Sequence, residues 1–145
     1  MTVAEELQPL REVASARGWK LEKAGTTLLQ LGMQGRDASW FWLHVKCDRY
    51  PTIPPAWHWY NPETETLDQP QDIPKGGNFF HSNYVICAPW NRLAYKTINA
   101  NGPHEDWMIG DWLTNPYTKG CKTLASMALR IFVELQSQNF AGRMG

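Results

Sequence analysis

The sequence predicts an α+β fold: a helix, a four-stranded antiparallel meander, an irregular segment that carries a cysteine, and a second helix. Apolar residues near both ends of the chain recur at helical spacing. Between them, four short stretches alternate apolar and polar residues, as half-buried strands do. Prolines and glycines then interrupt the second half, where long regular elements do not fit. With 145 residues, the chain is expected to form a single domain over 1–145.

The first helix is expected close to the N-terminus. Thr2 and Glu5 have the spacing of a capping box. Pro9 conflicts with a continuous helix, because a proline in the interior costs on the order of 3 kcal/mol. The helix is therefore either kinked at Pro9 or begins there, and Gly18 is a suitable end in both cases. The apolar face consists of Val3, Leu7, Leu10 and Ala14.

Four strands follow, and their alternation assigns the side chains to two faces. The expected ranges are 20–23, 29–34, 39–47 and 56–60. In the third strand, Phe41, Leu43, Val45 and Cys47 point to one side. Trp57 and Trp59 share a face of the fourth strand, where packing in the sheet core is the default interpretation. One face of this meander is expected to carry the core and to receive the helix.

The remaining chain is less regular until its last helix. Residues 50–55 contain three prolines, which fix φ and favour extended neighbours, so they predict a bend between the third and fourth strands. Turn residues over 61–77 predict a long loop, and 79–88 reads as extended backbone without much regular pairing. A final amphipathic helix is expected from about Thr118 to Gln138, with Cys121 on its apolar face.

Composition narrows the classes of function. The chain has 14 Lys and Arg and 14 Asp and Glu, so no basic excess points to nucleic acid. No stretch approaches the roughly 20 apolar residues of a membrane span, and the N-terminus lacks the pattern of a signal peptide. Three widely spaced cysteines favour a reducing, cytoplasmic setting. Neither the short ligand spacing of zinc sites nor a Gly-rich phosphate loop occurs, so we expect no metal and no cofactor.

Two motifs, in this order of elements, resemble the ubiquitin-conjugating enzyme family. The segment Tyr50–Pro55 matches its YP-x-x-PP signature, and Ile86-Cys87 matches the pair that carries its active thiol. His81-Ser82-Asn83 is similar to its His-Pro-Asn tripeptide. The resemblance covers nearly the whole chain. The chain departs from the family in four ways. The gap from Pro55 to Cys87 is longer, and only one helix follows the cysteine. In the tripeptide, serine replaces proline, and the tripeptide lies closer to the cysteine. These differences point to a divergent, bacterial member.

The resemblance implies that Cys87 receives the C-terminal acyl group of a ubiquitin-like protein from an activating enzyme, as a thioester. Cys87 would then pass this group to an amine on a target protein. Asn83 is implied as the donor to the oxyanion of the transfer step, although stabilisation of a turn explains it equally well. Asp106 or Asp111 would position or deprotonate the acceptor lysine; a role in helix capping explains Asp111 equally well.

The histidines and the other cysteines have their own interpretations. His81 is a candidate to orient its loop through a hydrogen bond to backbone. His104 is a candidate base or donor near Cys87, with a solvated loop histidine as the alternative. Cys47 and Cys121 are expected to pack in the core. Two other functions stay open: a non-catalytic module of the same fold that binds a ubiquitin-like protein, and a cysteine hydrolase that uses Cys87 with His81 or His104.

Overall fold

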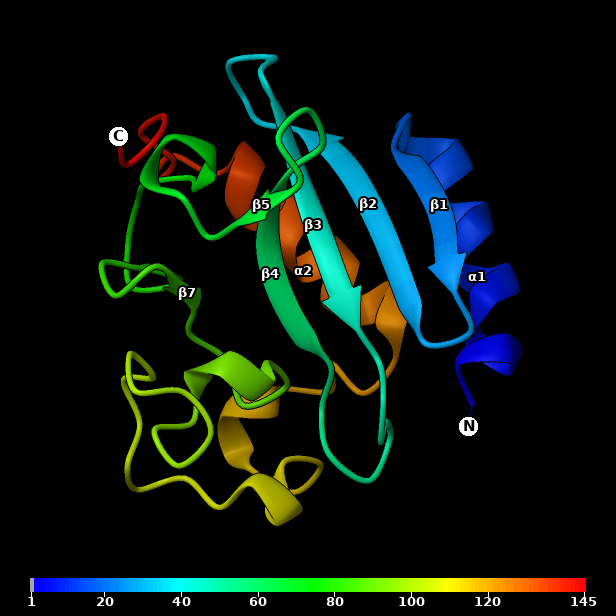
Figure 1. Cartoon of the computed structure of the whole chain (residues 1–145), viewed down its shortest axis with the longest axis vertical. Coiled ribbons are helices and arrows are strands. Elements are labelled where there is room, and N and C mark those ends of the chain that lie inside the picture. The colour runs from blue at the N-terminus through cyan, green and yellow to red at the C-terminus, as the bar shows by residue number, and fades with distance from the viewer. Residues whose placement is uncertain (1) are drawn as a thin grey trace.

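In the computed structural model, which describes residues 2–145, both helices lie on one face of an antiparallel sheet (Figure 1). The sheet is a meander in which each strand pairs with the next along the chain, in the order β1-β2-β3-β4-β5. Its strands are β1 (Lys20–Gly25), β2 (Leu28–Gln34), β3 (Trp40–Lys46), β4 (Ala56–Asn61) and β5 (Thr66–Leu67). The predicted α+β architecture is confirmed, with a fifth strand in addition to the four expected.

The first helix, α1 (Val3–Arg17), has the expected capping box at its start, between Thr2 and Glu5. Gly18 ends it in the left-handed conformation, with φ 74°, which glycine adopts without a steric cost. Pro9 lies inside the helix, so the alternative in which the helix begins at Pro9 is wrong. Burial of one face against the core, which includes Leu10, offsets the cost of this proline.

The two faces of the sheet differ as the alternation predicts. The side chains of β2 and β3 that face the core are fully buried. The side chains that alternate with them along each strand are at least partly exposed. Trp57 and Trp59 of β4 are each 1% exposed and belong to the core. On the outer face, the Trp42 indole lies over Gly32, where a Cβ atom would come within 2.8 Å of the ring. The sheet therefore buries one face under the helices, and aromatic rings cover part of the other.

The segment expected to be a long loop contains regular structure. β5 pairs with the end of β4 after a turn in which the Asn61 side chain accepts hydrogen bonds from two backbone N–H groups. Beyond it lie a short 3₁₀ helix, η1 (Pro70–Asp72), and a hairpin of β6 (Phe80–His81) and β7 (Val85–Ile86). Strands of two residues are too short to show an alternating pattern, so the sequence does not reveal them.

Three further 3₁₀ turns lie between β7 and the second helix: η2 (Arg92–Ala94), η3 (Ile109–Asp111) and η4 (Pro116–Thr118). The second helix, α2 (Leu124–Gln136), is shorter than the predicted range at both ends. Lys119 and Gly120 have φ values of 50° and 79°, which interrupt a right-handed helix, and Thr123 then caps a new start with Ser126. The prediction that Cys121 lies on a helix face is wrong, since Cys121 precedes α2.

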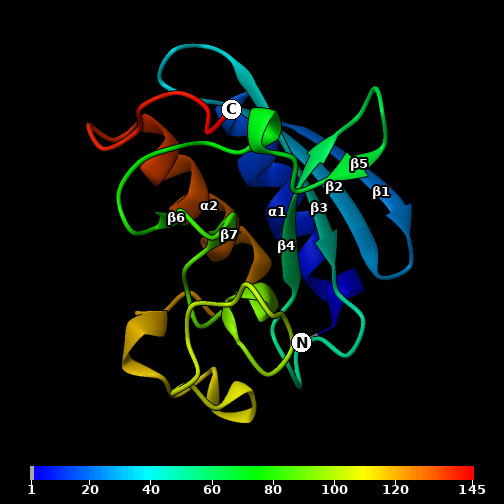
Figure 2. The ribbon, with the colours of Figure 1, turned by 60° about the vertical axis from the view of Figure 1, so that its left-hand side comes forward.

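A buried carboxylate joins the two helices to the proline bend. Glu6 of α1, 3% exposed, accepts a hydrogen bond from the Tyr50 hydroxyl at 2.6 Å. Its other oxygen accepts the backbone N–H of Leu124, at the start of α2, at 2.7 Å. Figure 2 shows α1 and α2 on the same side of the sheet, where the two helices contact each other, and β7 contacts β4 and η2. Over residues 2–145, neither helix has the length and apolar character needed to cross a bilayer.

Candidate active site

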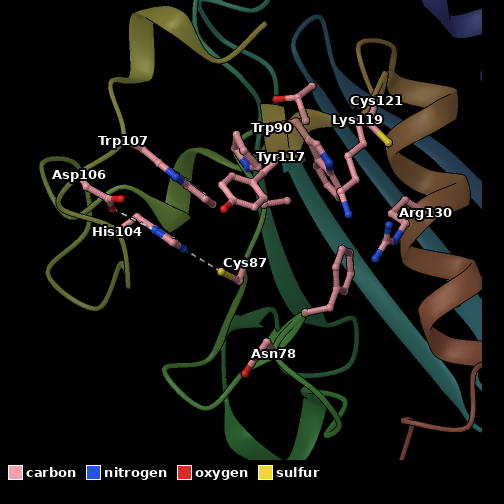
Figure 3. Close-up of a pocket in the computed structure, with 14 residues that line it drawn as sticks. Asn78, Cys87, Trp90, His104, Asp106, Trp107, Tyr117, Lys119, Cys121 and Arg130 are labelled. Atoms are coloured by element: carbon pink, nitrogen blue, oxygen red, sulfur yellow. Dashed lines mark hydrogen bonds and ion pairs between the residues drawn. The ribbon is translucent and has the colours of Figure 1, made fainter. Parts of the chain in front are cut away.

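Cys87 follows β7 directly and opens onto a cavity of about 540 Å³ (Figure 3). The hairpin fixes its backbone, because the Cys87 N–H donates to the carbonyl of Phe79 at 2.9 Å. The side chain is partly exposed, unlike that of the buried Cys47. The thiol is therefore held at a defined place on a cavity wall that another molecule can reach.

His104 and Asp106 extend from Cys87 as a chain of polar contacts. The Cys87 Sγ lies 3.2 Å from the Nε2 atom of His104, and the His104 Nδ1 atom lies 3.2 Å from a carboxylate oxygen of Asp106. Figure 3 shows the imidazole between the sulfur and the carboxylate. A nucleophile, a base within hydrogen-bond distance and a group that orients the base are the parts of a nucleophilic catalytic site.

The His104 ring is fixed by its backbone and by an aromatic neighbour. The His104 N–H donates to the Ala94 carbonyl at 3.1 Å, and the His104 carbonyl accepts from the Lys96 N–H at 3.0 Å. The Trp107 ring stacks on the imidazole, with the centroids 3.4 Å apart and the planes within 4°. These contacts restrict the imidazole to the plane in which Nε2 faces the sulfur.

The protonation pattern follows from the contacts of His104. The Asp106 carboxylate favours the tautomer that carries its proton on Nδ1, which leaves Nε2 free to accept the thiol proton of Cys87. Burial raises the pKa of the Cys87 thiol. The thiol is therefore protonated at rest, and the Nε2 atom of His104 is placed to accept its proton.

Asn91 ties the cysteine segment to the sheet. This side chain is completely buried, and its Nδ2 atom donates to the Ile86 carbonyl at 2.8 Å, one residue before Cys87. Its Oδ1 atom accepts the backbone N–H of Trp57 in β4 at 2.9 Å and that of Leu93 in η2 at 3.3 Å. One amide thus sets the distance between β4, β7 and η2.

Arg92 joins the same segment to the proline bend. Its backbone N–H donates to the Pro55 carbonyl at 2.9 Å, and its guanidinium donates to the Pro54 carbonyl at 3.0 Å. A second guanidinium nitrogen pairs with Asp48 at 3.0 Å. Arg92 therefore links the proline bend to the segment that follows Cys87.

The other candidate residues lie elsewhere. His81 and Asn83 belong to the β6–β7 turn, where the Asn83 N–H donates to the His81 Nδ1 atom at 3.1 Å, the kind of backbone contact expected of His81. Neither residue lines the Cys87 cavity; the amide side chain that does is Asn78. Asp111 is exposed in η3 and is also outside the cavity, where its backbone carbonyl accepts from the Thr114 hydroxyl.

Several residues that shape the site could not be identified from the sequence. Trp107 lies three positions after His104, and a stacked ring cannot be inferred from that spacing. Asn91 and Arg92 follow the cysteine closely, but only the fold shows what they contact. The close spacing of His104 and Asp106 is a signal that could have paired them. The remaining cavity wall includes Phe79, Trp90, Tyr117, Lys119, Cys121 and Arg130.

Among the described residues, no histidine lies within hydrogen-bond distance of either of the other cysteines. Burial raises the pKa of Cys47 to about 12 and also raises that of Cys121. Cys121 is partly buried and lines the cavity, whereas Cys47 is in the core. Within residues 2–145, no three His, Cys, Asp or Glu side chains converge closely enough to hold a metal ion. The chemistry of the site therefore centres on Cys87.

No protein-family model, curated protein or solved structure matches this chain. The function proposed below consequently rests on the geometry of its own residues and on the two motifs.

Proposed function

We propose that the protein is an acyl-carrier transferase of the ubiquitin-conjugating type, which holds the C-terminal acyl group of a ubiquitin-like protein on Cys87. The observation that carries the proposal is the contact of 3.2 Å between the Cys87 sulfur and the His104 imidazole at an open cavity. The link through Arg92 supports the ubiquitin-conjugating type, because it connects the proline bend to the segment that follows Cys87.

The loading step is a thioester exchange. The Cys87 sulfur attacks the carbonyl carbon of an acyl thioester carried by an activating enzyme, and His104 takes the thiol proton. The new carbon–sulfur bond forms as the old one breaks, and the departing thiol recovers a proton. The pocket needs no nucleotide, because activation by ATP belongs to the partner.

The transfer step returns Cys87 to its starting state. A nucleophile on the target attacks the acyl carbon, its proton passes to a base, and the carbon–sulfur bond breaks with Cys87 as the leaving thiol. Asn83 is far less suited to stabilise the oxyanion than the family resemblance implies, because its side chain does not line the cavity. His104 is the base that the geometry favours.

A cysteine hydrolase is the second candidate, because the contacts of His104 also suit that chemistry. In a hydrolase, water would attack the acyl group on Cys87, with His104 as the base and Asp106 as its orienting group. A purely non-catalytic binding module gains no support from this arrangement, since binding alone does not require a base at the sulfur.

The test uses a chemical donor in place of the unidentified modifier. A fluorescent peptide that ends in Gly-Gly, prepared as a small-thiol thioester, is mixed with the protein, and intact mass is followed over time. We expect one peptide per chain, bound through Cys87, which persists in water for many minutes and is released by a reducing thiol. Cys87→Ala should abolish the adduct, and the matched Cys121→Ala should not.

Two results would count against the proposal. Rapid release of free peptide acid, with catalytic turnover in water, would identify a hydrolase. An absence of adduct in folded wild-type protein would show that Cys87 is not a carrier of acyl groups.

A further inference from the structure

The charges around Cys87 bear on what receives the acyl group. Asp106 is the one carboxylate among the described residues that line the cavity, and its oxygen contacts His104. The cations there are Lys119 and Arg130. Arg130 pairs at 2.6 Å with Glu134, which lies outside the cavity, and no ion pair involves Lys119 within residues 2–145. The cavity therefore offers an incoming cation no free carboxylate.

This arrangement gives little help to a lysine acceptor. The lysine side chain is an ammonium ion near pH 7 and must lose a proton before it attacks. Lys119 disfavours the approach of a positive charge, and Asp106 is already engaged with His104. A neutral acceptor meets neither obstacle.

A hydroxyl acceptor matches the base that is present. Alcohols attack an acyl group only if a base removes their proton as the new bond forms, and imidazole is the side chain that does this near neutral pH. The His104 Nε2 atom is 3.2 Å from the sulfur to which the acyl group would be attached, so it lies beside the reacting carbon. The lining also contains Phe79 and Tyr117, which offer apolar contact to the chain that bears the hydroxyl.

We infer that charged Cys87 transfers its acyl group to a serine or threonine hydroxyl, in preference to a lysine amine; the inference rests on the proposed function. His104 takes the hydroxyl proton while the oxygen bonds to the acyl carbon. The carbon–sulfur bond then breaks, and His104 returns the proton to the departing Cys87 sulfur. The products are an oxygen ester and the free thiol, with no oxidation or reduction. Lys119 adds a preference for acceptors with an acidic residue beside the hydroxyl.

The experiment distinguishes a failure of this inference from a failure of the proposed carrier function. Protein charged with the Gly-Gly peptide thioester is freed of excess donor and divided among buffer and two acetylated, amidated tetrapeptides. These tetrapeptides contain one aspartate and differ only in serine or lysine. Loss of the acyl-enzyme is followed by intact mass, and the products are identified by mass and by cleavage of the ester with hydroxylamine.

We expect discharge onto the serine peptide at least about tenfold faster than onto the lysine peptide. In solution, thioesters react much more readily with amines than with hydroxyls, so this order can arise only from the enzyme. Faster transfer to lysine, or no acceleration by either peptide over buffer, would overturn the inference while the stable acyl-enzyme still supports a carrier. A failure to form any acyl-enzyme would instead overturn the proposed function.

Reversal of the charge at Lys119 tests whether the cavity contributes to the choice between hydroxyl and amine acceptors. Lys119→Glu should shift selectivity by about tenfold towards lysine, measured as the ratio of the two discharge rates. Lys122→Glu is the matched control, because Lys122 is exposed, lies outside the cavity and undergoes the same change of charge three positions away. If both variants changed the ratio of the two discharge rates equally, Lys119 would have no specific effect on selectivity.

Discussion

At the scale of single residues, the reactivity of Cys87 depends on two opposing influences. Burial raises the pKa of its thiol and so disfavours the thiolate. The His104 imidazole, 3.2 Å away, provides a path for the proton that does not require a free thiolate at rest. Asp106 holds the imidazole in the useful tautomer at 3.2 Å, but its side chain is 78% exposed. The sulfur and imidazole thus form the essential pair, and the carboxylate assists.

The exposure of Asp106 sets the size of its expected effect. Asp106→Asn should slow acylation of Cys87 by the peptide thioester by about tenfold, less than loss of a general base, because water can partly replace the carboxylate. The matched control is Asp111→Asn, which changes the other candidate acid without touching the cavity. Stopped-time intact mass gives both rates. An equal loss in the two variants would show that Asp106 has no particular role.

The pH dependence of alkylation tests whether the Cys87 thiol is protonated at rest. Because the Cys87 pKa is raised above the ordinary thiol value of 9.0, the rate with iodoacetamide should climb through pH 6–9 without a plateau. Cys47, whose pKa is raised to about 12 by burial, should stay unmodified in folded protein. Peptide mapping after timed alkylation measures each site. A plateau for Cys87 below pH 7 would instead indicate a stable thiolate–imidazolium pair.

The resemblance carried by Ile86-Cys87 and the proline bend selected Cys87, whereas its residue type and its place in a loop made His104 a candidate. Residue types did not separate Asp106 from Asp111, because both follow His104 closely and only the backbone decides which carboxylate reaches it. Asn83 shows the same limit: it lies in the turn between β6 and β7 and does not line the cavity, which no motif spacing reveals.

At the scale of elements, two buried polar side chains connect separate parts of the fold. Asn91 connects β4, β7 and η2 through three hydrogen bonds. Glu6 connects α1 to the Tyr50 hydroxyl and to the first N–H of α2. Buried polar groups of this kind stabilise a fold only while all their partners are present, because each orphaned group costs roughly 1–3 kcal/mol.

Removal of the Asn91 amide should therefore be costly. Asn91→Ala leaves the Trp57 N–H and the Ile86 carbonyl without their partner, and we expect the free energy of unfolding to fall by roughly 2–4 kcal/mol. Urea denaturation followed by tryptophan fluorescence measures the change. Asn101→Ala is the control, because Asn101 is exposed. A change in Asn91→Ala as small as in this control would mean that the amide does not hold the segment.

A similar loss is expected at Glu6, for the same reason. Glu6→Ala removes the acceptor of the Tyr50 hydroxyl and of the Leu124 N–H, so the free energy of unfolding should fall by about 2–4 kcal/mol. Glu12→Ala, on an exposed turn of the same helix, provides the comparison for the loss of a glutamate from α1. Equal stability of the two variants in urea would contradict a structural role for Glu6.

The elements themselves were predicted best where the pattern is long. The capping box at Thr2 and the alternation through Phe41 to Val45 specify α1 and β3 almost to the residue, because local sequence determines them. The start of α2 was misplaced by six residues, since the left-handed backbone at Lys119 and Gly120 overrides an apolar pattern that continues through Cys121. β5, β6 and β7 have two residues each and depend on tertiary pairing.

At the scale of the whole molecule, the helices and the sheet form a regular scaffold (Figures 1 and 2). The irregular segment beyond β7 lies at one end of this scaffold and supplies the residues of the candidate site. This scaffold was predictable because its core residues follow from the periodicity of apolar residues in the sequence. The placement of His104 beside Cys87 was not, because the chain between these residues, which are 17 positions apart, folds through η2 and a bridge between Tyr95 and His104. Function here depends on the part of the chain with the weakest pattern.

The central claim, that Cys87 and His104 act as one unit, is tested most directly by chemical rescue. The measurement is the rate at which the peptide thioester acylates Cys87 in His104→Ala, with and without added imidazole, relative to wild type. We predict a rate about 100-fold or more below wild type, restored in part by imidazole in proportion to its concentration, with the fold unchanged by circular dichroism. A variant that acylates as fast as wild type, or whose loss imidazole does not relieve, would contradict the account.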